Sequence, residues 1–294
     1  MSPPRRGAAL KSLQYRLEWL ALKSALGVIR LLPLDAASWL GGRIWRVVAP
    51  FNARHRRAVA NLQAAFPEKS PQECDAIARD MWENLGRVMA ETLQLDRLAA
   101  DPSRFAFDIG PAERAFEGKG SIIVSMHSGN WEVCALGGLA AGRQPAGVYQ
   151  ALKNPLADEL LKNLRAPIYP AGLFSKGHDT ARRLMAIARG GGMVAFLADL
   201  RDVRGIRVPF FGREAHATPF PASLARGSSL PLIASRVVRL KGARFRIEAR
   251  PVAYPVTGDR KADITAATAL VHRQFEEWIR ENPSQWMWIH RKWV

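Results

Sequence analysis

The sequence predicts an α/β fold in which a central, mostly parallel sheet is flanked by helices. Short β-rich runs at residues 121–125 and 193–197 each follow a probable helix, and strands that alternate with helices form sheets covered by helical layers. The chain has 294 residues, of which 48% are hydrophobic, so it can build one large core. No repeat, low-complexity tract or long linker divides the sequence, which favours one main domain with an attached helical segment.

Residues 1–52 are expected to form an N-terminal membrane-associated helical segment, and residues 53–294 the main domain. Residues 13–32 show helical apolar spacing beside three basic residues that recur every seven positions: Arg16, Lys23 and Arg30. Pro33 ends this helix, and a second apolar stretch over residues 36–51 contains two tryptophans, a residue type that favours the membrane interface. A basic stripe beside an apolar face is typical of a helix that lies in the interface.

The apolar stretches of this segment are interrupted by charges. Each one ends before the ~18 clean residues that a transmembrane helix usually needs, so the helices are expected to lie on the membrane, partly inserted, rather than to cross it. The alternative is an ordinary amphipathic helix that packs on the domain and leaves its basic stripe in water. The first residues, MSPPRRGAALK, lack the features of a secretory signal, so the N-terminus is expected to be retained.

Helix and strand signals follow one another along the main domain. Ser70 and Glu73 form a capping box with proline at the first helical position, and apolar residues at helical spacing extend this helix over residues 71–95. Further helices are expected at residues 155–165, 179–189 and 264–280, and later strands at residues 230–238 and 244–251.

The chain is strongly basic, since 43 Lys and Arg against 26 Asp and Glu leave a formal charge of +17. The expected partners are polyanions: an anionic membrane surface, an acidic protein or a phosphorylated substrate. Nucleic acid is disfavoured, because the basic residues are scattered and the sequence has no zinc-finger spacing, aromatic RNA-binding signature or basic zipper. Two cysteines, Cys74 and Cys134, make no disulfide framework, which fits a site facing the reducing cytoplasm.

The segment richest in chemistry is Ser-Met-His-Ser-Gly-Asn-Trp-Glu at residues 125–132, where a buried strand ends and a helix is expected to begin. Ligands bind at such strand ends in open α/β sheets. His127 would emerge there, and Gly129 permits a sharp turn that folds Glu132 back toward the imidazole. A carboxylate on one ring nitrogen fixes the tautomer and leaves the other nitrogen to take a proton from an alcohol. On spacing alone, an ordinary surface or core histidine is the commoner explanation.

The box HSGNWE, residues 127–132, resembles the H-x4-D/E box of glycerolipid-type acyltransferases, and in particular the HxGNWE form of the late lauroyl and myristoyl acyltransferases of lipid A biosynthesis. Further blocks resemble this family in the same order along most of the chain: residues 57–62, residues 66–68, Glu91, Asn154 with Pro155 and Arg165, residues 208–212, residues 217–218 and residues 283–293. Gln150 and Leu200 depart from the family pattern, which bears on substrate preference more than on reaction type.

The resemblance implies an O-acyltransferase whose catalytic pair is His127, the general base, and Glu132, its orienter. The other implied site residues would bind substrate or the oxyanion: Asn130, Arg165 and Asp199. Asn130 would hold the box in shape by hydrogen bonds, and Arg165 would face the oxyanion or a substrate phosphate. A solvated arginine at a helix end explains Arg165 equally well. Asp199 would contact the acceptor or only brace a loop.

The family also implies the substrates. The donor would be an acyl chain on acyl-carrier protein, an acidic partner that suits a chain of +17. The acceptor would be a hydroxyl of a lipid A precursor at the cytoplasmic face of the inner membrane, with no metal or organic cofactor. The alternatives are an acyl-CoA-dependent acyltransferase of another phospholipid or glycolipid, and a basic membrane-surface binding protein that is not an enzyme. A serine or metal hydrolase lacks support, because the sequence has no G-x-S-x-G or H-E-x-x-H motif.

Two groups of aromatic residues have alternative roles. Phe210 and Phe211 would line an acyl channel or, as is commoner for such residues, fill the core. Trp286, Trp288 and Trp293 would meet phospholipid headgroups or form a packed C-terminal cap.

Overall fold

A computed structural model of the chain describes residues 6–115, 120–175 and 177–293. Within these residues, seven strands form the main sheet: β1 (Phe105–Asp108), β2 (Ser121–Ser125), β3 (Pro145–Tyr149), β4 (Leu173–Ser175), β5 (Met193–Leu197), β8 (Leu232–Arg239) and β9 (Phe245–Pro251). Their order is β1-β9-β8-β2-β5-β3-β4. All neighbours run parallel except β8 and β9, so the predicted mostly parallel sheet is confirmed.

Residues of the central strands alternate between two buried faces, as the period of two along a strand requires. In β2, Ile122 and Val124 join the larger core, and Ile123 joins the core of the opposite face. Strands β5 and β8 alternate between the same two cores. A parallel sheet that is buried on both faces accounts for the continuous apolar runs in the sequence.

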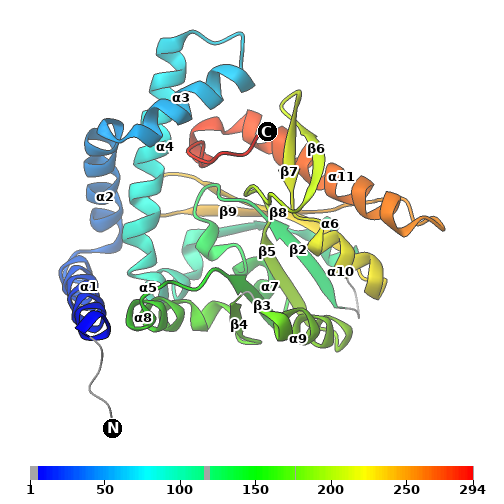
Figure 1. Ribbon diagram of the computed structural model, residues 1–294, viewed down its shortest axis with the longest axis horizontal. Helices are drawn as coiled ribbons and strands as arrows, with labels where there is room; N and C mark the ends of the chain where they lie inside the picture. Colours follow the sequence, from blue (N-terminus) through cyan, green and yellow to red (C-terminus); the bar gives the residue numbers. More distant parts are fainter. Residues whose placement is uncertain (1–5, 116–119, 176, 294) are drawn as a thin grey trace.

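Helices flank the sheet on both faces (Figure 1). The larger core includes side chains of α9 (His178–Arg189), α10 (Phe220–Ser228) and α11 (Arg260–Glu281), together with side chains of the two helices at residues 53–65 and 71–92. The other cores include side chains of α5 (Leu95–Ala99), α6 (Gly110–Ala115) and α7 (Leu136–Ala140). The helix predicted at residues 155–165 is α8 (Pro155–Arg165). Short 3-10 helices are η1 (Ala49–Phe51), η2 (Pro102–Arg104), η3 (Trp131–Val133), η4 (Ala166–Ile168) and η5 (Pro283–Gln285).

The long helix predicted after Ser70 is α4 (Pro71–Thr92), and it begins with the expected capping box. The Ser70 hydroxyl accepts from the backbone N–H of Glu73, whose carboxylate accepts from the backbone N–H of Ser70. α4 packs closely on α2 (Leu34–Val48) and lies next to α3 (Ala53–Ala65) (Figure 1). A Cβ at Gly86 of α4 would collide with the carbonyl of Gly41, so the close approach of the two helices needs glycine there.

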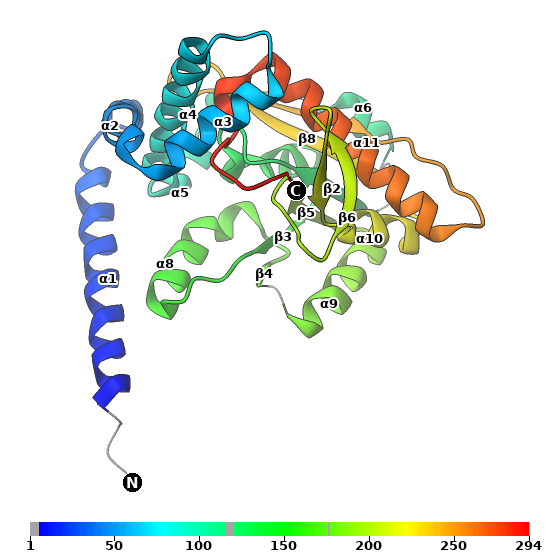
Figure 2. The same cartoon turned by 45° about the horizontal axis from the view of Figure 1, so that its top comes forward.

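The N-terminal segment contains α1 (Arg6–Arg30) and α2, while residues 1–5 lie outside the described part of the chain. α1 lies at one side of the protein, where it contacts α8, and its N-terminal end points away from the body (Figure 2). Arg30 forms a bidentate ion pair with Asp96, so it does not continue the exposed stripe of Arg16 and Lys23 that the sequence suggests. Among the described residues, no helix is both long enough and apolar enough to span a bilayer.

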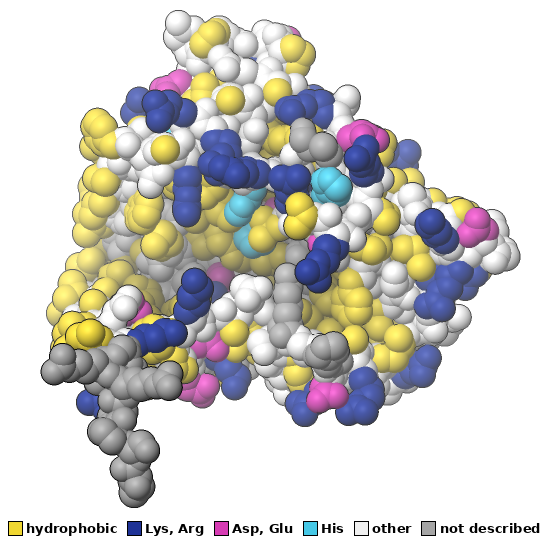
Figure 3. Space-filling view, viewed as in Figure 1, with side chains coloured by type: hydrophobic (Ala, Val, Ile, Leu, Met, Phe, Trp, Pro, Cys, Tyr) yellow, Lys and Arg dark blue, Asp and Glu magenta, His cyan; other side chains and the backbone are white. Residues whose placement is uncertain are grey.

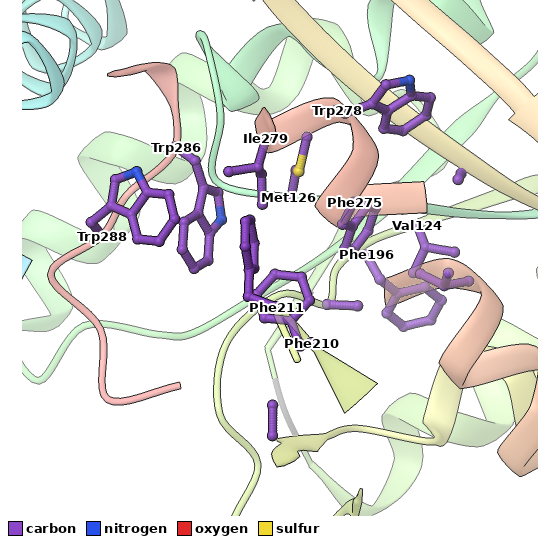
Figure 4. Close-up of a cluster of buried hydrophobic side chains, with 14 of the residues drawn as sticks. Val124, Met126, Phe196, Phe210, Phe211, Phe275, Trp278, Ile279, Trp286 and Trp288 are labelled. Atoms are coloured by element: carbon purple, nitrogen blue, oxygen red, sulfur yellow. The ribbon is translucent and has the colours of Figure 1, made fainter. Parts of the chain in front are cut away.

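The C-terminal tail lies between the box at residues 125–132 and a hairpin of β6 (Ile206–Phe210) and β7 (Arg213–Ala217). Isolated bridges join Ser128 to Trp286 and Ala215 to Trp293. Five buried aromatic side chains pack together there: Phe210, Phe211, Trp286, Trp288 and Trp293. Figure 4 shows the first four of them. Of the two roles open to the tryptophans, the structure therefore supports the packed cap.

Candidate active site

The centre of the site is built by two neighbouring parallel strands. The register of β2 and β5 pairs Ser125 with Leu197. His127 and Asp199 each stand two residues beyond these strand ends, so their side chains meet at the carboxyl edge of the sheet. Ligands bind at this edge in open α/β sheets. Strand pairing thus joins two residues that lie 72 positions apart in the sequence.

Asp199 holds His127 through two hydrogen bonds. Nδ1 of His127 donates to Oδ1 of Asp199 at 2.7 Å, and the backbone N–H of His127 donates to Oδ2 at 2.9 Å. The indole of Trp286 donates to the same Oδ2 at 2.9 Å. Because the carboxylate can only accept a hydrogen bond, Nδ1 of the neutral imidazole bears the proton and Nε2 bears the lone pair. Within the described residues, Nε2 of His127 has no hydrogen-bond partner, and His127 lines the main pocket.

The structure corrects the predicted partner of His127, which is Asp199 and not Glu132. Glu132 instead forms a bidentate ion pair with Arg165, with Nε to Oε2 at 2.6 Å and Nη2 to Oε1 at 2.7 Å. The physical reason is that the box continues into the short η3, in which Glu132 faces the end of α8. Asp199 is already hydrogen-bonded to Nδ1 of the imidazole. Arg165 is therefore an ion-paired residue of the pocket and not a solvated helix end.

The charges of the site set its pKa values. Burial alone lowers the pKa of His127, but the charge and hydrogen bond of Asp199, with the charge of Glu132, raise it above its ordinary value. Burial opposes ionisation of Asp199, yet its contacts with His127 hold its pKa far below the usual range. Burial likewise opposes the charge of Arg165, and Glu132 keeps the pKa of Arg165 high. The site thus contains the ionised carboxylate of Asp199, the ion pair of Arg165 with Glu132, and the imidazole of His127, whose pKa is raised.

The turn of the box requires glycine at Gly129, whose φ is +58°. A Cβ there would collide with the carbonyl of Val237 on β8. Asn84 of α4 donates to the carbonyl of Gly129 at 2.9 Å, and the backbone N–H of Gly129 donates to the carbonyl of Gln285 at 3.1 Å. The turn is therefore held from three sides, by the sheet, by α4 and by the C-terminal segment.

Asn130 belongs to a buried network behind the site. Its side-chain oxygen accepts from the backbone N–H of Glu132 at 3.1 Å, and its amide donates to Glu91 at 2.8 Å. Glu91 in turn forms a bidentate ion pair with Arg239, at 2.5 and 2.9 Å, and accepts from the hydroxyl of Ser38 at 2.6 Å. Asn130 is 0% exposed and does not line the pocket. This supports its predicted role in holding the box and speaks against contact with substrate.

The site opens into a pocket of about 620 Å³, within the size range of ligand sites. Its polar residues include His127, Glu132 and Arg165, and its apolar wall includes Val148, Leu173, Leu184, Phe196 and Phe220. Figure 3 shows a hollow with an apolar floor and histidine side chains, rimmed by Lys and Arg side chains. Both residues that depart from the family pattern, Gln150 and Leu200, line the pocket.

The pocket lining decides between alternative roles that the sequence left open for several residues. Phe210 and Phe211 do not line the pocket and are buried, so the structure places them in the core. Trp131 and Tyr169, which the sequence does not single out, do line it. The described residues contain no group of three or more His, Cys, Asp and Glu side chains that could hold a metal ion. His127 and Asp199 each follow a buried strand by two residues, so the sequence placed both at strand ends, but it did not show that the two strands are neighbours.

Comparison with known proteins agrees with the motifs. A family model described as bacterial lipid A biosynthesis acyltransferase matches residues 4–294. The lipid A biosynthesis lauroyltransferase of Escherichia coli (strain K12) is 29% identical over 306 residues, which cover 98% of this chain and 95% of that protein. The lipid A biosynthesis palmitoleoyltransferase of the same strain and the lipid A biosynthesis acyltransferase of Shigella flexneri are each 27% identical over 296 residues, covering 95% of this chain and 91% of each protein. The chain therefore belongs to the bacterial lipid A biosynthesis acyltransferases and is an O-acyltransferase.

Proposed function

We propose that this acyltransferase uses His127 as a general base, oriented by Asp199, to move a fatty acyl chain from acyl-carrier protein onto a hydroxyl of a lipid A precursor. The observation that carries the proposal is the state of the imidazole. Its Nδ1 is bound to a buried carboxylate, and its Nε2 has no hydrogen-bond partner among the described residues of a pocket with an apolar wall. This is the arrangement that a proton acceptor needs.

In the proposed reaction, Nε2 of His127 takes the proton of the acceptor hydroxyl while the hydroxyl oxygen attacks the carbonyl carbon of the thioester. Asp199 stabilises the imidazolium that forms. The tetrahedral intermediate then collapses, the C–S bond breaks, and the imidazolium returns the proton to the departing thiolate. The products are an ester and a free thiol. Because the acceptor hydroxyl takes the place that a serine has in a triad, no acyl-enzyme forms.

Arg165 has a separate role in this proposal. Glu132 engages Nε and one N–H of Nη2, which leaves the other guanidinium N–H groups available to the pocket. These planar donors would stabilise the oxyanion of the tetrahedral intermediate or bind a phosphate of the substrate. Glu132 fixes the orientation of the guanidinium, so we assign it as a positioning residue for Arg165.

The N-terminal helices would bring this site to an anionic membrane surface at the cytoplasmic face of the inner membrane. Apolar side chains of α1, α2 and the turn between them are exposed: Leu10, Leu13, Leu17, Leu20, Val28, Leu31, Trp39, Leu40, Ile44, Val47 and Val48. Hydrophobic side chains cover the edge of the molecule in Figure 3 where Figure 1 places α1 and α2. Large exposed apolar patches mark membrane or protein interaction sites.

α1 is also connected to the site. Asn154, at the start of α8, donates to the carbonyl of Tyr15 at 2.8 Å and to the carboxylate of Glu18 at 3.0 Å. Arg165 is the last residue of the same α8. α8 therefore connects α1 at its first turn with the pocket at its last residue. A lipid acceptor bound beside α1 would lie close to the pocket, which supports delivery of the acceptor from the membrane.

The test of the donor and acceptor is a transfer assay with purified enzyme and a lipid A precursor, followed by mass spectrometry of the lipid. Acyl-carrier protein and CoA, carrying the same acyl chain, are compared as donors. We expect transfer from the carrier protein and much slower transfer from CoA. Equal or faster transfer from CoA would favour the acyl-CoA-dependent alternative, and no transfer from either donor would remove the proposal.

Membrane association is tested by flotation with vesicles. We expect the protein to float with anionic phosphatidylglycerol vesicles, and the triple substitution Leu13→Glu, Leu17→Glu, Leu20→Glu to abolish flotation. A control introduces glutamate at two exposed apolar positions elsewhere, Leu240→Glu and Val256→Glu, and should float. Normal flotation of the triple variant would exclude α1 as the contact with the membrane.

A further inference from the structure

Lys292 is a buried cation that the proposed reaction does not use. It is 0% exposed, and no carboxylate of the described residues lies within ion-pair distance of its ammonium group. Nζ donates to Nε2 of His272 at 3.0 Å and to the carbonyl of His216 at 3.3 Å. It lies 5.5 Å from the ring centroid of Phe210. Nδ1 of His272 donates to the carbonyl of Thr268 at 2.9 Å, so its Nε2 bears the lone pair that accepts from Lys292.

A buried charge without a counter-ion destabilises the fold, so its presence calls for an explanation. Burial lowers the pKa of Lys292 to about 8, and the charge of Asp199 acts in the opposite direction. The ammonium group is therefore largely charged at neutral pH. Asp199 is the anion that acts on it, although the two groups do not touch.

An aromatic layer separates Lys292 from Asp199. Phe210 lies beneath the ammonium group and contacts Trp286 edge to face, with ring centroids 5.7 Å apart. Trp286 donates directly to Asp199. Figure 4 shows Phe210 and Trp286 side by side in the buried cluster. Because apolar side chains screen charge poorly compared with water, Lys292 and Asp199 interact across this layer.

The other titratable groups near Lys292 leave its charge unopposed. On α11, burial lowers the pKa of His272 to about 3, and in the tail, burial lowers the pKa of His290 to about 4, so both are neutral. On β7, His216 contributes its backbone carbonyl. Arg213 of the same strand lies 5.1 Å above the ring of Trp293 and adds a further positive charge.

The groups that face His127 are also defined. Asp199 follows β5 and bears the negative charge that binds Nδ1. The charge of Glu132 of η3 also raises the pKa of His127, but Glu132 is ion-paired with Arg165 of α8. From the tail, the neutral ring of His290 lies 5.9 Å from the ring of His127. The unbalanced anion beside His127 is therefore Asp199.

We propose that Lys292 is a positioning residue for proton transfer: its buried positive charge offsets Asp199 and keeps His127 uncharged, and so able to accept a proton, at the pH at which the enzyme works. This role presupposes the proposed function of His127 as the base. Without the cation, Asp199 would favour the imidazolium more strongly, because a nearby negative charge stabilises it. The ammonium group would thus lower the pKa of His127 through its charge, without touching the substrate.

The test measures the pKa of His127 directly, by NMR of protein labelled at histidine, with the signal assigned from the His127→Ala variant. Lys292→Gln removes the charge but keeps an N–H donor for His272, and Lys292→Arg keeps the charge. We expect Lys292→Gln to raise the pKa of His127 by roughly half a unit to one unit. Lys292→Arg and the exposed control Lys261→Gln should leave this pKa unchanged, and the signal of the distant His55 serves as an internal reference.

The direction of the shift separates this role from a merely structural one. If Lys292 only filled space, its loss would loosen the site, admit water to Asp199 and lower the pKa of His127 toward its ordinary 6.5. A lowered or unchanged pKa in Lys292→Gln overturns the proposal. If that variant does not fold, Lys292→Met replaces it, since methionine fills the same space without a charge.

A second measurement links the shift to the reaction. The acid limb of the pH profile of kcat/KM should move to higher pH in Lys292→Gln by the same amount as the pKa of His127. A limb that stays in place while the pKa moves would contradict the proposal. The titration does not require turnover, so a wild-type enzyme without acyl transfer would remove the proposed function while the titration still decides whether Lys292 acts on His127.

Discussion

Among the described residues, two histidine–aspartate pairs have nearly equal contact distances. Nε2 of His55 bonds Oδ1 of Asp75 at 2.8 Å between α3 and α4, and Nδ1 of His127 bonds Oδ1 of Asp199 at 2.7 Å at the edge of the sheet. The side chain of Asp75 is 40% exposed and that of Asp199 is 0% exposed. The contact distance alone does not tell a base from a structural histidine.

The second ring nitrogen makes the difference. The indole of Trp82 donates to Nδ1 of His55 at 3.2 Å, so both nitrogens of that ring are engaged. Nδ1 of His127 is hydrogen-bonded to the buried carboxylate of Asp199, while Nε2 has no partner among the described residues. A histidine can act as a base when one nitrogen is anchored and the other is accessible to substrate. The comparison predicts that equivalent substitutions in the two pairs will have different consequences.

The largest difference is expected on removal of the two imidazoles. His127→Ala should lower turnover by about 10²- to 10⁴-fold with the fold intact, because the proton acceptor is lost. His55→Ala should leave turnover within a few-fold of wild type and lower the free energy of unfolding by about 1–3 kcal/mol, because Trp82 and Asp75 lose a shared partner. Transfer assays and urea unfolding measure the two effects. Wild-type turnover in His127→Ala would sink the mechanism.

The carboxylates should differ next. Asp199→Asn places an N–H group where the carboxylate accepts three hydrogen bonds, and the imidazolium loses its counter-charge. We expect turnover to fall by at least about 10²-fold, because the same change of the orienting carboxylate in a serine-protease triad lowers turnover about 10⁴-fold. Asp75→Asn, with its partly exposed side chain, should leave turnover unchanged. Equal rates for the two variants would show that orientation by Asp199 is unimportant.

The two arginines that bind carboxylates near these histidines offer a smaller contrast. Arg165→Lys retains the charge but loses the planar fork that binds Glu132 and faces the pocket. We expect turnover to fall by about tenfold to 10²-fold, with the larger loss in kcat if the guanidinium stabilises the oxyanion. Arg79→Lys, in a half-exposed pair with Asp75, is the matched control and should be silent. A loss confined to KM would instead assign Arg165 to ground-state binding.

The smallest effect is a displacement of the pH profile. Because the pKa of His127 is raised above 6.5, activity should fall as the pH drops through that raised value and Nε2 becomes protonated. In Asp199→Asn, the residual activity should show its acid limb at lower pH, since the anion that raises the pKa is gone. Asp75→Asn should leave the limb in place. The measurement is kcat/KM against pH, and a limb that moves upward in Asp199→Asn would contradict this electrostatic account.

Local signals predicted the helices and strands well. The helix predicted at residues 155–165 has those bounds in α8, where Asn154 caps its first turn, and the strands at residues 121–125 and 193–197 are β2 and β5. The prediction was less good after the box, where η3 precedes a short α7 in place of one helix. Capping, apolar periodicity and breakers act within a few residues, so the sequence reports them directly.

The functional residues divide in the same way. His127, Arg165 and Asp199 could be named from the sequence, but their pairing could not, and Glu132 was assigned to the wrong partner. Lys292 carries no local signal that it is buried, because a lysine between an arginine and a tryptophan near a chain end looks like a surface residue.

The sequence by itself determined the α/β class, the position of the box at a strand end and the need for glycine in its turn. Only the tertiary structure decided that β5 lies beside β2 in a register that matches Ser125 with Leu197, and so brings Asp199 to His127. The physical reason is the distance along the sequence over which each interaction acts. Periodicity along a strand determines which face a side chain occupies, whereas the neighbour of a parallel strand is chosen by packing between segments that a long crossover separates.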